Sequence, residues 1–356
     1  MLSNNRKDIE IPDKLGSAFM NVLNSSKKEK AAAIISFEER VLVEKEEHKK
    51  TISDSPIVIE AVELAKKLKG VEFDFSVRIK DGFFKCNDHY PMQGINLYLD
   101  QGKTYLVLGA PRSGKSSLLK MIAGILPEDK DHEVGGELTV NNISPKTKGV
   151  VWPNIVGYID QIERLHPHLT VQETCDFAWQ CRTGGTHRTP MIGDDAEVDA
   201  TVKKMDEDNY KVMTVLDSMG LTRVKDTFVG DQQTVRGVSG GEKKRVTVSE
   251  MSVGNFPILC MDEISTGLDA ATTYDICKLL GEITALFKGI RVTSLLQPPP
   301  ETFALFDDLI LLSEGMVIYS GPVEEVVPYF ESLGYKLPDR MDPADFLQVS
   351  ARAIIF

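Results

Sequence analysis

A continuous apolar run, Thr104–Gly109 (TYLVLG), leads directly into the stretch GAPRSGKS, and this junction limits the folds open to the chain. Such a run is typical of a strand buried on both faces, as in a parallel sheet covered by helices. The stretch fits G-x-x-x-x-G-K-[ST] at every fixed position, and the helical pattern SSLLKMIAG follows it. Glycines let the backbone curl so that several N–H groups point inward, and a helix start adds unpaired donors. The junction therefore predicts a strand, a phosphate-binding loop and a helix in an α/β fold.

The predicted loop assigns roles to individual side chains. Lys115 is expected to reach the β- and γ-phosphates of a nucleotide, and the Ser116 hydroxyl is expected to be a ligand of Mg²⁺. The backbone N–H groups around these two residues supply the remaining donors. The residues predicted to contact the nucleotide here are Gly109, Ala110, Pro111, Arg112, Ser113, Gly114, Lys115, Ser116 and Ser117.

Three further apolar runs predict buried strands, namely Pro257–Glu263 (PILCMDE), Arg291–Leu296 (RVTSLL) and Leu309–Gly315 (LILLSEG). Helical stretches separate them, which favours a parallel sheet. Upstream of the loop, the segments VEFDFSVRI and GINLYLDQG alternate apolar and polar residues. Alternation of this kind is typical of half-buried strands, and we expect these two to be antiparallel. The upstream phenylalanines, Phe75, Phe83 and Phe84, are predicted to be core residues rather than adenine-stacking ones.

The region from about residue 162 to 250 has helical patterning. Thr170 and Glu173 have the spacing of a capping box, which predicts a helix start. A second helix is predicted to end at Gly220. Its apolar face consists of Val212, Val215, Leu216 and Met219.

Two adjacent acids, Asp262 and Glu263, end the run ILCMDE. A buried carboxylate is costly unless it is paired or bound to a metal. Asp262 is therefore expected to hold Mg²⁺ through the water shell of the ion. Glu263 is placed to polarise the attacking water as a general base. With the phosphate loop, the acids predict a P-loop NTPase.

The charge balance argues against nucleic acid as a partner. The chain has 53 acidic and 41 basic residues and a formal net charge of −12, whereas wide nucleic-acid contact needs a basic surface. No run of 18 apolar residues occurs, so no segment is predicted to span a bilayer. Five scattered cysteines without a CxxC pair fit a reducing compartment.

The stretch VSGGEKKRVTVSE, Val238–Glu250, resembles the signature motif of ABC-type ATPases, usually written LSGGQ. We expect Ser239, Gly240 and Gly241 to lie just ahead of a helix beginning near Glu242, where small residues and a helix start form an anion site. The resemblance implies that these three residues bind ATP held on a second nucleotide-binding domain. Two such domains would stack head to tail, so the chain alone would not turn over ATP efficiently.

Two other stretches match motifs of the same family in the expected order. Gln161 in GYIDQ matches the glutamine of the Q-loop, which implies contact with Mg²⁺ and a relay of the nucleotide state toward a transmembrane domain. Asp269 in STGLD matches the D-loop, which lies at the interface of the two ATP sites. The stretches DEISTGLDAATTYDI and SLLQPPPETFALFDDLILLSEGMVIYSGP look like the G subfamily, of the pleiotropic drug resistance type. They are most similar to its N-terminal ATPase domain.

The resemblance implies a domain plan and a function. The fold would be an α/β P-loop NTPase with a parallel-sheet core, an antiparallel β subdomain and an inserted α-helical subdomain. Residues 1–55 are expected to be a charged leader, partly disordered or helical around 27–49. The ATPase domain would span 56–350, with the core and β subdomain in 56–161 and 251–335 and the helical subdomain with the signature in 162–250. Residues 336–356 would begin a connector toward a transmembrane region missing from the chain.

The implied activity is ATP hydrolysis with Mg²⁺ that powers export of small molecules. The implied partners are a second nucleotide-binding domain and an ABC transmembrane domain, with the chain at the cytoplasmic face of a membrane. Many members place a histidine before QP at the end of this strand, whereas this chain has Leu296. One contact to the γ-phosphate is then missing, which predicts a slower site. A soluble ABC ATPase acting on ribosomes or DNA, and a non-hydrolysing regulatory ATP-binding half, remain the alternatives.

Overall fold

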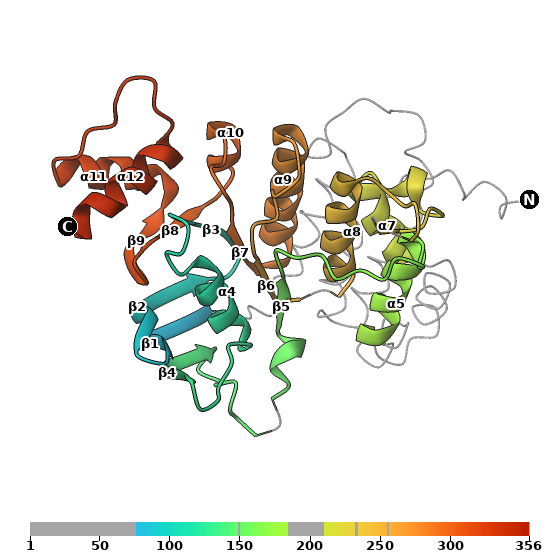
Figure 1. Cartoon of the computed structure of the whole chain (residues 1–356), viewed down its shortest axis with the longest axis horizontal. Helices are drawn as coiled ribbons and strands as arrows, with labels where there is room; N and C mark the ends of the chain where they lie inside the picture. The colour runs from blue at the N-terminus through green and yellow to red at the C-terminus, as the bar shows by residue number, and fades with distance from the viewer. Residues whose placement is uncertain (1–75, 149, 184–209, 232–233, 255, 356) are drawn as a thin grey trace, which may run out of the picture. The chain divides into compact units, whose positions relative to one another are not determined.

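The computed structural model describes residues 76–148, 150–183, 210–231, 234–254 and 256–355 (Figure 1). Contacts between Cα atoms divide these residues into two compact units. The sheet unit holds residues 76–162 and 256–355, and the helical unit holds residues 163–254, in both cases within the described ranges. The predicted leader, 1–55, and Phe75 lie outside the described residues.

The larger sheet of the sheet unit has six strands in the spatial order β5-β6-β7-β3-β8-β9. Their bounds are Val156–Ile159 for β5, Ile258–Met261 for β6, Ile290–Ser294 for β7, Lys103–Gly109 for β3, Asp308–Ser313 for β8 and Met316–Pro322 for β9. The first five are parallel, and β9 pairs antiparallel with β8. The residues of β6, β7 and β8 are all buried, as apolar runs in parallel strands predict. The four strands expected from these runs are confirmed, although β7 ends two residues before Leu296.

The smaller sheet is antiparallel and has the order β2-β1-β4. Its strands are β1 (Ser76–Cys86), β2 (His89–Asp100) and β4 (His132–Val140). The first two correspond to the alternating segments, so the antiparallel pair is confirmed. The third strand comes from later in the chain and pairs with β1, which sequence patterning did not predict.

The helices of the sheet unit follow the strands in chain order. They are α4 (Lys115–Ala123), α9 (Ala270–Phe287), α10 (Pro300–Phe303), α11 (Val326–Ser332) and α12 (Pro343–Ile355), with short 3₁₀ turns η4 (Trp152–Asn154) and η7 (Val323–Glu325). Both α9 and α12 contact β3, and α12 also contacts β8. The segment 336–356, expected to begin a connector, thus contributes a helix that packs on the larger sheet.

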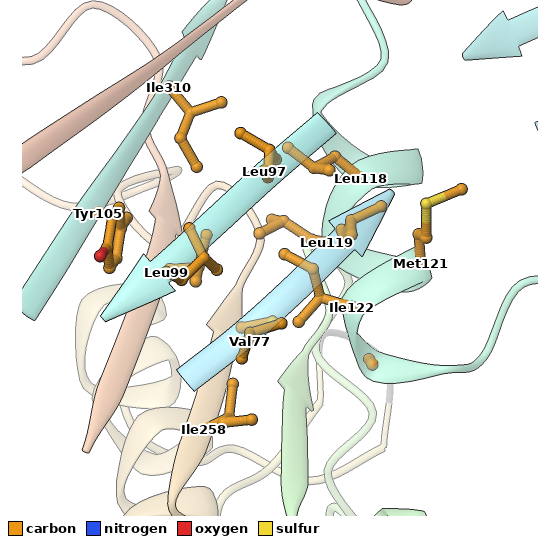
Figure 2. Packing of buried hydrophobic residues seen from close by; sticks show 14 of the residues in the cluster. Val77, Leu97, Leu99, Tyr105, Leu118, Leu119, Met121, Ile122, Ile258 and Ile310 are labelled. Atoms are coloured by element: carbon orange, nitrogen blue, oxygen red, sulfur yellow. The ribbon is translucent and has the colours of Figure 1, made fainter. Parts of the chain in front are cut away.

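The core of the sheet unit is made by α4 together with both sheets. Figure 2 shows Leu118, Leu119 and Ile122 of α4 among side chains of β1, β2 and the larger sheet. Leu99 of β2 and Tyr105 of β3 belong to the same buried cluster. Because α4 begins at the end of the predicted phosphate loop, this packing holds the loop in place. Phe84 is also in this cluster, as predicted for a core residue.

The helical unit consists of α5 (Val171–Thr183), α7 (Tyr210–Ser218), α8 (Gly240–Ser252) and the 3₁₀ turn η6 (Thr222–Val224). The three α-helices contact one another. The Glu173 N–H donates to the Thr170 hydroxyl at 3.2 Å and the Glu173 carboxylate accepts the Thr170 N–H at 2.8 Å, so the predicted capping box is confirmed. The apolar face predicted for the second helix is buried, and Gly220 after α7 has a φ of 63°.

Substitution of two adjacent residues tests whether the side chains of β2 alternate between buried and exposed positions. Leu99 is fully buried and Tyr98 is 58% exposed. We expect Leu99→Ala to lower the free energy of unfolding by about 2–5 kcal/mol, because it removes buried methyl groups and leaves a cavity. Tyr98→Ala should change it by only about 0.5 kcal/mol. Urea denaturation measures both, and equal losses would contradict the register of this strand.

Candidate active site

The loop between β3 and α4 has the backbone shape that its glycines predict. Gly114, just before α4, has a φ of 103°, a left-handed conformation that glycine adopts without a Cβ clash. A Cβ atom on Gly109 would collide with the Leu312 carbonyl oxygen and the Ser113 hydroxyl. The Ser113 hydroxyl is buried and has no hydrogen-bond partner among the described residues. The loop is therefore a tight curl with an unsatisfied polar atom of the kind that a bound phosphate can satisfy.

Lys115 lies among the loop carbonyls and near both predicted acids. It is 5% exposed, and its Nζ donates to the carbonyl oxygens of Gly109 at 2.9 Å and Ala110 at 3.2 Å. Burial lowers the pKa of Lys115, and the negative charges of Glu263 and Asp262 oppose this shift. Such charge effects act between neighbouring groups. The structure thus brings the predicted phosphate-binding lysine and the predicted acids together.

The remaining loop residues differ in exposure. Pro111 and Arg112 are exposed, and Arg112 has a φ of 67°. Ser116 and Ser117 are half-buried in the first turn of α4. The Ser116 hydroxyl is thus at the positive end of the helix dipole, beside the place where phosphates are expected.

Asp262 follows β6 and is 2% exposed. Its Oδ1 accepts the Ser294 hydroxyl at 2.8 Å, and its Oδ2 accepts the Tyr158 hydroxyl at 3.1 Å. Burial raises the pKa of Tyr158, so this phenol stays protonated and able to donate at neutral pH. Each carboxylate oxygen keeps a further lone pair. Asp262 therefore fits the role of an outer-shell ligand of Mg²⁺.

Glu263 is half-buried and contacts the predicted Q-loop glutamine. Its Oε2 accepts the Gln161 Nε2–H group at 2.6 Å, and its backbone N–H donates to the Ser294 hydroxyl at 2.8 Å. The φ of Glu263 is 47°, a left-handed value that is unusual for a residue with a side chain. Gln161 comes shortly after β5, and the structure places it beside Glu263.

Leu296 lies beyond the end of β7, which is next to β6 on one side and β3 on the other. Its side chain is 44% exposed and has no hydrogen-bonding atom. The next residue, Gln297, has a φ of 43°, and its Nε2 donates to Asp345 Oδ1 of α12 at 3.2 Å. The strand end thus presents an apolar side chain between the strands that carry the loop and the acids.

The residues of the predicted signature begin α8 in the helical unit. Sequence patterning placed the helix start near Glu242, whereas α8 begins at Gly240 with Ser239 as its N-cap. The cause is a capping box: the Glu242 N–H donates to the Ser239 hydroxyl at 3.3 Å, and the Glu242 carboxylate accepts the Ser239 N–H at 2.8 Å. Ser239 and Gly240 are exposed and Gly241 is half-buried. The first backbone N–H groups of α8 are therefore near solvent, as an anion site requires.

Asp269 is the N-cap of α9. Its Oδ1 accepts the Thr272 N–H at 2.7 Å, and this bond lowers the pKa of Asp269. The residue is exposed. Its hydrogen bond to Thr272 is that of a helix cap, so its place at an interface of two ATP sites stays a prediction.

Sequence reasoning missed the roles of Glu242, Ser294 and Tyr158. The S-x-x-E spacing of Ser239 and Glu242 was a readable signal for a capping box. Ser294 and Tyr158 carried a weaker signal, since each is a hydroxyl near the carboxyl end of an apolar strand. Their role depends on which strands are neighbours, which local patterning does not reveal.

Comparison with known families and proteins agrees with this geometry. A family model described as ABC transporter matches residues 92–266, and one described as ABC-2 type transporter matches residues 296–350. ABC transporter G family member 44 of Oryza sativa subsp. japonica is 43% identical over 258 residues, covering 68% of this chain and 17% of that protein. For ABC transporter G family member 35 of Arabidopsis thaliana the identity is also 43% over 258 residues, covering 68% of this chain and 18% of that protein. The chain thus spans less than a fifth of the length of these relatives.

Solved structures agree on the fold. A nucleotide-free ATP-binding cassette from an ABC transporter superposes with a TM-score of 0.55 at 20% identity, covering 72% of this chain and 95% of that one. A dimeric ATP-binding cassette in a post-hydrolysis state, bound to ADP and phosphate, superposes with a TM-score of 0.54 at 20% identity. The superposition covers 69% of this chain and 98% of that one. The predicted P-loop α/β fold is confirmed.

The glycine loop between β3 and α4, with a buried lysine near two acids that follow β6, is the arrangement of a P-loop NTPase, and the family match narrows this class to an ATP-binding cassette. The chain belongs to the ABC transporter family, and its relatives are G-family members. The segment that matches the ABC-2 model forms α10, β8, β9, η7, α11 and most of α12. Within the part of the chain that the structure describes, no helix combines the length and apolar character needed to cross a bilayer.

The capping box of α8 predicts a pH-dependent stability. Hydrogen bonds from Ser239 lower the pKa of Glu242, so its charge stabilises the folded state above the ordinary glutamate pKa, and this contribution is lost as pH falls through the lowered value. We expect Glu242→Gln to be less stable than wild type at pH 7 and equally stable under acidic conditions, because glutamine keeps a neutral capping bond. Urea midpoints at both pH values measure this. Glu331→Gln, at an exposed site on α11, is the control and should show no such change.

Proposed function

We propose that this chain is the ATP-binding and ATP-hydrolysing domain of an ABC transporter and that it powers transmembrane export of small molecules. The convergence of Lys115, Asp262 and Glu263 carries the proposal. The strand that leads to the lysine, β3, and the strand that leads to the acids, β6, are parallel and flank β7, so they end at the same edge of the sheet. A buried cation suits the phosphates of a nucleoside triphosphate, and the carboxylates suit a metal ion and the attacking water. The transporter relatives and the ADP-bound cassette with a similar fold support the same assignment.

Phosphate binding would involve the loop and the start of α4. In the structure the Lys115 ammonium donates to two loop carbonyls, and these bonds are exchanged for bonds to the β- and γ-phosphates when ATP binds. The backbone N–H groups of Gly109–Ser117, apart from Pro111, which has none, and the unsatisfied Ser113 hydroxyl supply neutral donors. The affinity therefore comes from charge and backbone geometry together.

Ser116, Asp262 and Gln161 are the residues proposed to hold Mg²⁺. Mg²⁺ prefers oxygen ligands and keeps several of its waters, which a hydroxyl, a carboxylate and an amide oxygen can accommodate. Bound Mg²⁺ neutralises charge on the phosphates. The Nε2–H group of Gln161 donates to Glu263, and its amide oxygen is the atom proposed to contact the metal.

Glu263 would accept the proton of the attacking water. Its carboxylate is held by Gln161 on one side, and its backbone is held by Ser294 on the other. Gln161 therefore contacts the proposed base directly and would also relay the state of the site to the transmembrane domain. A base in a fixed orientation is what general base catalysis needs.

The proposed assembly needs a second nucleotide-binding domain. Ser239, Gly240 and Gly241 present the start of α8, where unpaired N–H groups and the helix dipole favour an anion. In the proposal this anion is the γ-phosphate of ATP on the partner domain, and Asp269 lies at the shared interface. The chain would work at the cytoplasmic face of a membrane through an ABC transmembrane domain, with no nucleic acid involved.

Leu296 favours one alternative, a regulatory half that binds ATP and hydrolyses it slowly or not at all. A leucine makes no hydrogen bond to the developing charge in the transition state. Removal of one such donor costs on the order of 3 kcal/mol. Glu263 opposes this alternative, because a chain that only bound ATP would have no use for an oriented base.

Substitution of Lys115 tests ATP binding. We expect Lys115→Ala to weaken ATP affinity roughly ten- to a hundredfold, since it removes a charge-assisted contact to phosphate. Isothermal titration calorimetry measures the Kd, and circular dichroism checks the fold. Lys146→Ala, an exposed lysine with 77% side-chain exposure, is the control and should bind ATP normally. Unchanged affinity of a folded Lys115→Ala variant would remove the basis for the proposal.

Placing a hydrogen-bond donor at position 296 tests whether Leu296 slows ATP hydrolysis. In an assembled transporter whose other ATP site is disabled, Leu296→His should raise kcat roughly ten- to a hundredfold, because the imidazole can contact the γ-phosphate. Leu296→Phe adds bulk without a donor and should leave kcat unchanged. If the histidine variant folds and binds ATP but is no faster, the assignment of this strand end is wrong.

A further inference from the structure

Asp262 is held from both sides by hydroxyl groups of the flanking strands. Its strand, β6, lies between β5 and β7 in the larger sheet. Tyr158 of β5 donates to Oδ2 at 3.1 Å, and Ser294 of β7 donates to Oδ1 at 2.8 Å. The two carboxylate oxygens are therefore fixed in direction by two independent strands. A carboxylate with a single partner can rotate about its Cβ–Cγ bond, whereas this one is constrained.

Ser294 also holds the second acid. Its hydroxyl accepts the Glu263 N–H at 2.8 Å while it donates to Asp262, so one oxygen atom bridges both acids. The side chain is fully buried, so water does not compete for these bonds. The bridge restrains the backbone of Glu263 at its left-handed φ of 47°.

Tyr158 is held in turn by α4. The Lys120 ammonium lies over its ring, 5.9 Å from the ring centroid, which is within the range of a cation–π contact. The phenol is therefore connected to the helix that begins with Lys115. Residues on β5, β7 and α4 together orient the carboxylate that follows β6.

We propose that Ser294 and Tyr158 are positioning residues, which aim Asp262 at the metal site and, in the case of Ser294, fix Glu263 as the base. The inference rests on the proposed ATPase function. Neither hydroxyl is assigned a contact with nucleotide or metal, so each acts through an acid. Partners of this kind typically change metal affinity or activity about ten- to a hundredfold when they are removed.

A purely structural role is the competing explanation, and the fold contains a matched control. The buried Thr104 hydroxyl, on β3, donates to Asp307 Oδ2 at 2.7 Å and accepts the Asp307 N–H at 3.2 Å. This repeats the donor and acceptor pattern of Ser294. Thr104 lies at the amino end of its strand, whereas the phosphate loop follows the carboxyl end. Thr104→Val therefore measures the cost of losing such a bond without disturbing the site.

The test uses the full chain and the nucleotide AMP-PNP, which resists hydrolysis. Isothermal titration calorimetry gives its Kd with Mg²⁺ and with EDTA, and the ratio measures the gain from the metal. We expect Tyr158→Phe and Ser294→Ala to reduce this ratio roughly tenfold while the Kd in EDTA stays near wild type. Thr104→Val should keep the wild-type ratio, and Ser294→Thr, which retains the hydroxyl, should restore it.

Measurement of kcat at different Mg²⁺ concentrations in the assembled transporter distinguishes the role of Tyr158 from that of Ser294. Tyr158→Phe affects Asp262 alone, so saturating Mg²⁺ should restore its kcat. Ser294→Ala also releases Glu263, so its kcat should remain about ten- to a hundredfold low at any Mg²⁺ concentration. A pair of variants with identical Mg²⁺ profiles would contradict the bridging role of Ser294.

Two outcomes distinguish failure of this inference from failure of the proposed function. If wild type binds AMP-PNP with a gain from Mg²⁺ but both variants keep that gain, the inference is wrong and the ATPase proposal stands. If wild type binds no nucleotide, both the inference and the proposed ATPase function are wrong. Should Ser294→Ala fail to fold, Ser294→Cys and Tyr158→Phe decide the question. If a variant binds AMP-PNP more weakly by the same factor with and without Mg²⁺, its hydroxyl has a structural role only and the inference is wrong.

Discussion

The structure depends on one geometric constraint, the parallel alignment of β6, β7 and β3. Neighbouring parallel strands end at the same edge of a sheet, and the pairs Met261↔Thr293 and Val107↔Ser294 set how far each one extends. The phosphate loop, the two acids and the strand end at Leu296 are far apart in the sequence, yet this register gathers them. Burial of both faces makes the register costly to change, because a slip of one residue would put side chains of different size into closely packed positions.

Charge within the site follows from this arrangement. A lysine that is almost fully buried, beside a buried aspartate, would be unfavourable if either were alone. Here the lysine has carbonyl partners, the aspartate has two hydroxyl partners, and opposite charges lie near each other. The site is therefore polar but largely satisfied, with the Ser113 hydroxyl as a buried donor still lacking a partner among the described residues.

Much of this could be predicted from sequence, for identifiable reasons. Continuous apolar runs located β3, β6, β7 and β8, because burial on both faces favours apolar residues along most of such a strand. The glycine loop was recognisable because its backbone conformation restricts residue choice. The sequence misplaced one strand end and one helix start by two residues each. The strand β7 stops at Ser294 instead of Leu296, and α8 starts at Gly240 instead of Glu242. The pairing of β4 with β1 and the bridge made by Ser294 depend on spatial neighbours, and local periodicity contains no information about them.

The backbone of Glu263 has a consequence for any attempt to make this protein more robust. A side chain at a φ of 47° costs roughly 1–2 kcal/mol relative to an unstrained conformation. Glycine would adopt that conformation freely, so replacement by glycine would relieve local strain and at the same time delete the carboxylate. Thermal tolerance and turnover are thus opposed at this position, and a screen for heat resistance alone would select against the very group proposed to activate water.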